Sequence, residues 1–192
     1  MKLQELFKSF IGKDEIISVY CNPDDNYATI VGFAAQIDDD YLICNEVSRT
    51  GEYDGYVLRK AEQIFRIDHG SYYENSLTKA FAHEKSKHKN IPNDKSVFIN
   101  FINFAKETGL VVSVGIREHS GSYSVTGYID SIDEENENLT IHTITKEKEG
   151  GFDGFTVVNF ADCFRMCCDA YDERYFQLLN KIANGDNKYE IF

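Results

Sequence analysis

The chain is 192 residues long, with a hydrophobic content of 42% and a formal charge of −12. This composition excludes an intrinsically disordered chain, because there is enough apolar surface to offset chain entropy. The acidic balance argues against a DNA partner, since Lys and Arg drive binding to a phosphate backbone. No segment approaches the roughly 20 apolar residues that cross a bilayer, and no signal peptide is evident. We therefore expect a cytoplasmic protein with no membrane partner.

Apolar spacing in the first half predicts a helix followed by short strands. Leu3, Leu6, Phe7 and Phe10 lie on one face of a helix, because residues three, four and seven apart share a face. β-Branched and aromatic runs bounded by turn residues then predict strands. The strands are expected over residues 16–22, 27–38 and 41–47, with two more within 56–67, a loop at 22–26, and a short helix carrying Tyr73, Leu77 and Phe81.

An Asp-Gly pair occurs at a similar place in each half, as Asp54-Gly55 and Asp153-Gly154. We expect both pairs in hairpin turns, because Asp hydrogen-bonds within its own turn and Gly accepts a positive φ. The alternative is a ligand loop in which Asp holds a metal ion or a hydroxyl. The acidic runs 38–40 and 133–135 are expected at solvated hairpin tips, with a hard-cation site as the alternative.

The pattern of the first half restarts after residues 84–93, which lose the apolar periodicity and are predicted to form a linker. Spacing between matching residues changes only within predicted turns, where insertions are tolerated. We therefore predict an internal duplication, with a first domain over residues 1–83 and a second over 94–192. The matches are Gly32 with Gly127, Asp38 with Asp133, Leu42 with Leu139, Gly55 with Gly154, and Phe65 with Phe164.

Each half thus combines an N-terminal helix with about five short strands. Five such strands cannot leave both edges open and still bury a core, which favours a strongly bent, partly closed barrel. The predicted fold is mainly β with short helices, arranged as two tandem five-stranded bent barrels of SH3-like type. A pair of open α+β sheets is the alternative.

These features resemble the Sm-like family of small β-barrels, which includes the LSm and Hfq proteins. Gly32 and Asp38 match the Gly and Asp of the family's first motif, and the second half repeats both. The run from Lys60 to Ile64, Lys-Ala-Glu-Gln-Ile, is similar in kind to the family's second motif, Arg-Gly-acidic-Asn-apolar. The resemblance implies a barrel that binds single-stranded RNA, with Asp38, Tyr56, Arg59 and Lys60 as the candidate binding residues.

The chain departs from the family's pattern at the RNA pocket. Leu42 stands where the family commonly has Asn, and the second half has Asn-Phe-Ala-Asp-Cys over residues 159–163 in place of the second motif. Base contacts need the lost amide, and phosphate contacts need positive charge. The fold is therefore expected to be kept while RNA binding becomes the alternative function.

Five cysteines are expected as free thiols, because the chain lacks the features of a secreted disulfide scaffold. Cys163, Cys167 and Cys168 lie close in sequence, and His142 or His119 would complete a metal site in the alternative interpretation. An enzyme using one of these three cysteines would need a thiol of depressed pKa. The histidines do not recur between the halves, and we expect no catalytic residue, metal or cofactor.

The sequence therefore predicts a non-enzymatic protein that works by association, either with itself as a homo-oligomer or with another protein. Exposed edge strands of small barrels are suited to such pairing. An Sm-like RNA-binding module is the alternative.

Overall fold

The computed structural model describes residues 2–21, 29–118, 121–145 and 150–185. The loop predicted at residues 22–26 and the candidate ligand His119 lie outside the described residues. The chain divides into two compact units, unit 1 (Met1–Phe104) and unit 2 (Ala105–Phe192). Within the described ranges, no helix has both the length and the apolar character needed to cross a membrane.

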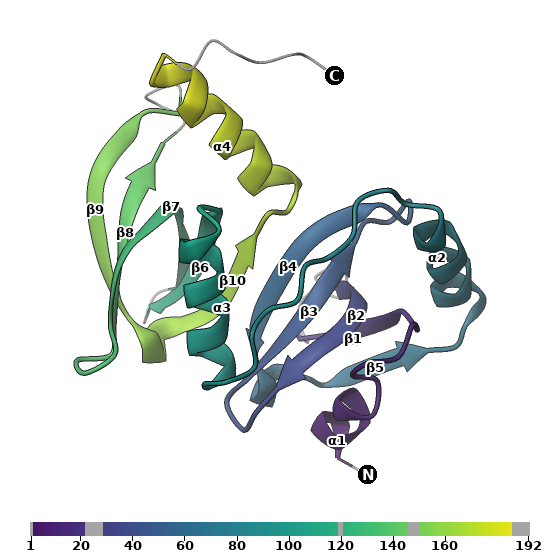
Figure 1. The fold of residues 1–192 in the computed structure, drawn as a ribbon. Coiled ribbons are helices and arrows are strands. Elements are labelled where there is room, and N and C mark those ends of the chain that lie inside the picture. The colour runs from purple at the N-terminus through teal and green to yellow at the C-terminus, as the bar shows by residue number, and fades with distance from the viewer. Residues whose placement is uncertain (1, 22–28, 119–120, 146–149, 186–192) are drawn as a thin grey trace. The chain divides into compact units, whose positions relative to one another are not determined.

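Unit 1 is an antiparallel sheet of five strands in the order β5-β1-β2-β3-β4, with a helix before the strands and another after them (Figure 1). A 3-10 turn, η1, separates the fourth and fifth strands. The elements are α1 (Leu3–Lys8), β1 (Ile17–Tyr20), β2 (Thr29–Ile37), β3 (Tyr41–Val47), β4 (Tyr53–Lys60), η1 (Ala61–Gln63), β5 (Arg66–His69) and α2 (Tyr72–Ala82).

Unit 2 repeats this order of elements. Its strands follow the order β10-β6-β7-β8-β9, and a 3-10 turn, η3, again separates the fourth strand from the fifth. The elements are α3 (Val97–Glu107), β6 (Val111–Glu118), β7 (Gly121–Asp133), β8 (Asn138–Ile144), β9 (Phe152–Asn159), η3 (Phe160–Asp162), β10 (Cys163–Cys168) and α4 (Tyr171–Ala183). The fold is thus mainly β with short helices, as predicted.

The same close backbone approach occurs between the second and third strands of each unit. A Cβ placed on Gly32 would lie 2.1 Å from the carbonyl oxygen of Asn45, and one placed on Gly127 would lie 2.1 Å from that of His142. Register shifts follow at matching places, after Ala34 in β2 and after Ile129 in β7. Both strands therefore bend where only glycine permits the contact.

The predicted hairpin turns at Asp54-Gly55 and Asp153-Gly154 are corrected by the structure, which places both pairs inside strands. Asn45 faces Tyr56 and Val47 faces Tyr53, so Asp54 and Gly55 form a bulge opposite one residue of β3. Gly55 and Gly154 do take the positive φ expected of them, +75° and +83°. The turns themselves use Gly51 and Gly150, which also have positive φ. Gly51 is needed at its turn because a Cβ there would lie 2.5 Å from the Cβ of Ala80.

The boundary between the two units falls inside α3, and the segment predicted as a linker packs on unit 1. Gln36 of β2 donates from Nε2 to the carbonyl oxygens of Ile91 and Pro92, at 2.9 Å each. The Asn100 amide in α3 donates to Gln36 Oε1 at 3.2 Å. Residues 84–104 are therefore part of the packed structure of unit 1.

Candidate functional site

Asp38, a candidate RNA ligand, is engaged by the chain's own backbone. Its Oδ1 accepts hydrogen bonds from the amides of Asp40 (3.0 Å) and Tyr41 (2.8 Å), which shapes the hairpin tip between β2 and β3. Its Oδ2 accepts from the amide of Val97 at 2.8 Å, at the first residue of α3. A carboxylate at this position satisfies an N-terminal helix amide and faces the positive end of the helix dipole.

The other predicted RNA residues are separated by the fold. Tyr56 and Arg59 are buried, with exposed fractions of 1% and 7%. The Tyr56 hydroxyl accepts from the amide of Lys89 at 2.6 Å. Lys60 is half-buried, and its Nζ lies 4.9 Å from the centroid of the Tyr41 ring. Asp38 and Lys60 thus lie at the same end of the β3–β4 pair, whereas Tyr56 and Arg59 belong to the interior.

A row of side chains crosses one face of the unit 1 sheet from β2 to β4. Phe33 faces Asn45, and Asn45 faces Tyr56. His88 covers this row, with its ring centroid 5.4 Å from that of Tyr56, and its Nε2 donates to the carbonyl oxygen of Glu46 at 2.8 Å. Side chains of the segment 84–104 therefore pack over this face of the unit 1 sheet.

Helix α3 continues the cover along β3 and β4. The Phe104 ring lies 5.1 Å from that of Tyr56, and the Phe98 ring lies 5.0 Å from that of Tyr41. Leu58, the next residue on this face of β4, has no exposed surface. The β3–β4 part of this face of unit 1 is thus buried by the chain that follows α2.

The matching row in unit 2 is half-buried at Tyr128 and His142 and exposed at its β9 end. Tyr128 faces His142, and His142 faces Phe155, in the register of the unit 1 row. The His142 ring stacks on both aromatic neighbours in β9, at 3.7 Å from Phe152 and 4.4 Å from Phe155. Phe155 is nevertheless 61% exposed and Val157 is 64% exposed, although they match the buried Tyr56 and Leu58.

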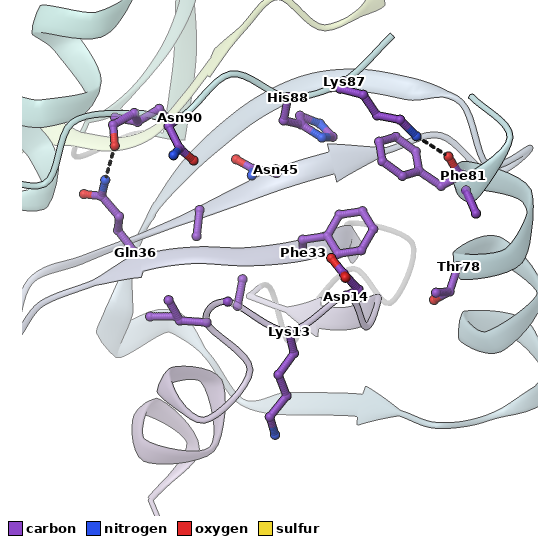
Figure 2. Close-up of a pocket in the computed structure, with 16 residues that line it drawn as sticks. Lys13, Asp14, Phe33, Gln36, Asn45, Thr78, Phe81, Lys87, His88 and Asn90 are labelled. Atoms are coloured by element: carbon purple, nitrogen blue, oxygen red, sulfur yellow. Dashed lines mark hydrogen bonds between the residues drawn. The ribbon is translucent and has the colours of Figure 1, made fainter. Parts of the chain in front are cut away.

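An open cavity of about 670 Å³ lies in unit 1 beside the covered row. Figure 2 shows the rings of Phe33, Phe81 and His88 gathered on one side of it, with the Asn45 amide near them. The ring centroid of Phe81 lies 5.1 Å from that of Phe33 and 5.4 Å from that of His88. This is a concave, aromatic-walled space of the size that small ligands occupy.

Three of the cysteines, Cys21, Cys44 and Cys168, lack the environment of a nucleophile, whereas Cys167 Sγ accepts a hydrogen bond from Arg165 Nε at 3.2 Å. All five are buried and none forms a disulfide. Burial raises the pKa of Cys21 to about 11, and burial likewise raises the pKa values of Cys44 and Cys168. Nucleophilic cysteines need the opposite shift. No group of three or more His, Cys, Asp or Glu side chains able to hold a metal ion occurs within the described ranges.

A buried Ser–Glu pair, which the sequence reasoning missed, occurs in both units. Ser18 Oγ of β1 donates to Glu74 Oε1 at 2.7 Å, and Ser113 of β6 hydrogen-bonds to Glu173. Both glutamates are at most 4% exposed and lie in the first turn of the helix that follows the fifth strand. The signal was available in the sequence, because each Ser and each Glu recurs at the spacing of its neighbours.

Comparison with known proteins gives no family assignment: no protein-family model matches the chain, and no curated protein matches it.

Proposed function

We propose that this chain is a non-enzymatic, tandem small-barrel protein of Sm-like type that associates with a second copy of itself through β9. The repeated order of one helix, four strands, a 3-10 turn, a fifth strand and a closing helix supports the Sm-like assignment. We also propose a cytoplasmic location, which fits five buried thiols without a disulfide.

The observation that carries the association proposal is the difference between matching positions in the two units. Phe155 and Val157 are 61% and 64% exposed, while the matching Tyr56 and Leu58 are buried and Tyr56 is covered by residues of the 84–104 segment. Burying apolar surface of this kind is favourable by about 25 cal/mol per Å². An equivalent cover for unit 2 would therefore be stabilising.

The edge of β9 is suited to pairing with another strand. This strand stands at the end of the strand order and carries no Lys, Arg or Pro and only one acid, Asp153. Edge strands without such residues pair readily with other strands. Two antiparallel β9 strands related by a two-fold axis would place the same apolar residues of each copy together, so one surface serves both partners.

Light scattering coupled to size exclusion tests this proposal. We expect the wild-type protein to associate as its concentration rises, and the double variant Phe155→Thr, Val157→Lys to remain a monomer with an unchanged circular dichroism spectrum. Tyr72→Ser, which removes a side chain that is 90% exposed in α2, serves as the matched control and should associate like the wild type.

Helix α4 has a second exposed apolar surface, which a variant of its own distinguishes from β9. Helix α4 exposes Tyr175, Leu178 and Ile182, where α2 has Ser76, Lys79 and His83 at the matching positions. Replacing the three α4 residues by the α2 residues should leave β9 association intact. A wild-type protein that is monomeric at every concentration, or association lost only in the α4 variant, would overturn the proposal.

A further inference from the structure

The cavity in unit 1 combines aromatic walls with an open mouth. It is bounded by β2, β3, α2 and the segments 11–14 and 87–91, and its volume is about 670 Å³ (Figure 2). The His88 ring is held in place by its hydrogen bond to the carbonyl oxygen of Glu46. Phe33 and His88 are half-buried and thus present preformed ring surfaces to a flat ligand, while the buried Phe81 packs behind them.

One polar atom in this wall is left without a partner. Asn45 Oδ1 is buried and accepts no hydrogen bond from the part of the chain that the structure describes. The neighbouring amide of Gln36 differs, because it donates to two carbonyl groups and accepts from Asn100. A buried acceptor without a donor is unfavourable and calls for a bound group that supplies an N–H or O–H.

The mouth of the cavity carries positive and negative charge. Lys87 is exposed, and its Nζ donates to the carbonyl oxygen of Phe81 at 2.8 Å while lying 4.5 Å from the centroid of the Phe81 ring. An ammonium group has three donors, so this contact leaves others for a ligand. Lys13 and Asp14 also lie at the mouth, and Figure 2 shows Lys13 pointing away from the rings.

The matching residues of unit 2 would not build this cavity. Asn180 stands where unit 1 has Phe81, and its amide donates to the carbonyl oxygen of Gly150 at 2.8 Å. His142 stands where unit 1 has Asn45 and stacks between Phe152 and Phe155. Among the residues that the structure describes, the unpartnered acceptor and the aromatic walls are therefore features of unit 1, and no residue of β9 lines the cavity.

We propose that this cavity binds a nucleoside or nucleotide with an amino-substituted purine base. The flat base packs among the rings of Phe33, Phe81 and His88, and its exocyclic amine donates to Asn45 Oδ1. Any phosphate lies at the mouth near Lys87. The nucleoside and the nucleotide share a planar ring with an N–H donor at its edge. Experiment decides whether the ligand carries a phosphate.

Calorimetric titration of the full chain with adenosine 5′-monophosphate tests the site. We expect one ligand per chain, with affinity about tenfold lower for purine riboside 5′-monophosphate, which lacks the exocyclic amine, since one hydrogen bond is lost. Adenosine binding as tightly as its monophosphate would identify the nucleoside as the ligand. Weaker binding of adenosine than of its monophosphate, together with an equal loss of affinity for the monophosphate in Lys87→Gln, would identify the nucleotide as the ligand.

Two variants separate binding from folding. Asn45→Leu should weaken binding about tenfold without lowering the melting temperature, because it removes an acceptor that has no partner. Phe33→Ala should also weaken binding. Asn136→Leu at the exposed hairpin tip of unit 2 is the matched control and should bind like the wild type. No binding of either adenosine compound to folded wild-type protein, or binding unchanged by Asn45→Leu, would overturn the proposal.

Discussion

Gly32 and Gly127 lie at close backbone approaches, because a Cβ on either would lie 2.1 Å from a carbonyl oxygen of the next strand. We predict that Gly32→Ala lowers the free energy of unfolding by about 3 kcal/mol, since the strands must separate to admit the methyl group. Gly12 has a positive φ but open space around it, so Gly12→Ala should cost about 1 kcal/mol. Urea unfolding compares the two, and equal losses would contradict this explanation.

The two buried glutamates are predicted to give opposite dependences of stability on pH. Burial raises the pKa of Glu173. Burial also opposes ionisation of Glu74, but hydrogen bonds from Ser71 and Ser18 outweigh it and lower the pKa of Glu74. Glu74 therefore contributes stability that is present above its unfolded pKa and is lost as pH falls through the folded pKa. Glu173 reduces stability as pH rises from its unfolded pKa through its folded pKa.

Urea unfolding of Glu74→Gln and Glu173→Gln at about pH 4 and about pH 7 measures these contributions. Relative to the wild type, Glu74→Gln should be less stable at the higher pH than at the lower pH. Glu173→Gln should show the reverse trend. The explanation is refuted by two variants whose stabilities change with pH in the same direction.

Single residues show what the sequence can and cannot predict. The match between Gly32 and Gly127 was predicted from their spacing, and both lie where strands bend, because a glycine inside a strand is a local signal. Burial of Glu74 and Glu173 was missed, because a glutamate in a helix is usually solvated and its partner lies in a strand distant in sequence.

At the scale of elements, Asp38 connects a hairpin tip to the start of α3. We predict that Asp38→Ala lowers the free energy of unfolding by about 2 kcal/mol, because three backbone amides lose their acceptor. Asp39→Ala, at an exposed position of the same tip, should cost less than about 0.5 kcal/mol. Chemical unfolding followed by circular dichroism measures both. Equal effects would mean that the contact with α3 contributes nothing.

The strands were easier to predict than their connections. The expected strand at 41–47 is β3, because a short apolar run and the turn residues that precede it agree there. The prediction that the Asp-Gly pairs form the hairpin turns was wrong, because they lie in the strands that follow those turns. A positive-φ glycine suits a bulge as well as a turn, so the pair alone does not distinguish the two. Residues 84–93 were read as a linker because their packing partners, including Gln36, are far away in sequence.

At the scale of the whole molecule, charge and geometry together argue against RNA binding. The formal charge is −12, Asp38 is engaged by backbone amides, and Tyr56 is buried. We predict no salt-sensitive binding of a short single-stranded oligouridine at low ionic strength, since few phosphates would meet a cation. Fluorescence anisotropy measures this. Binding that weakens in Lys60→Ala would support the RNA alternative instead.

The repeated order of elements followed from the sequence, because matching residues keep their spacing outside turns. The difference in exposure between the two units could not be predicted from the sequence. Phe155 and Tyr56 are similar in sequence context, and only the packing of residues 84–104 separates an exposed ring from a buried one. The aromatic cavity likewise depends on side chains from five separate segments of unit 1.

Hydrogen exchange at increasing protein concentration tests association through β9 most directly. Amides of residues 155–158 should exchange more slowly as copies pair, because pairing covers the edge of β9. Amides of β5 and α2 should not change. Exchange in β9 that is independent of concentration, while the protein associates, would contradict the proposed surface.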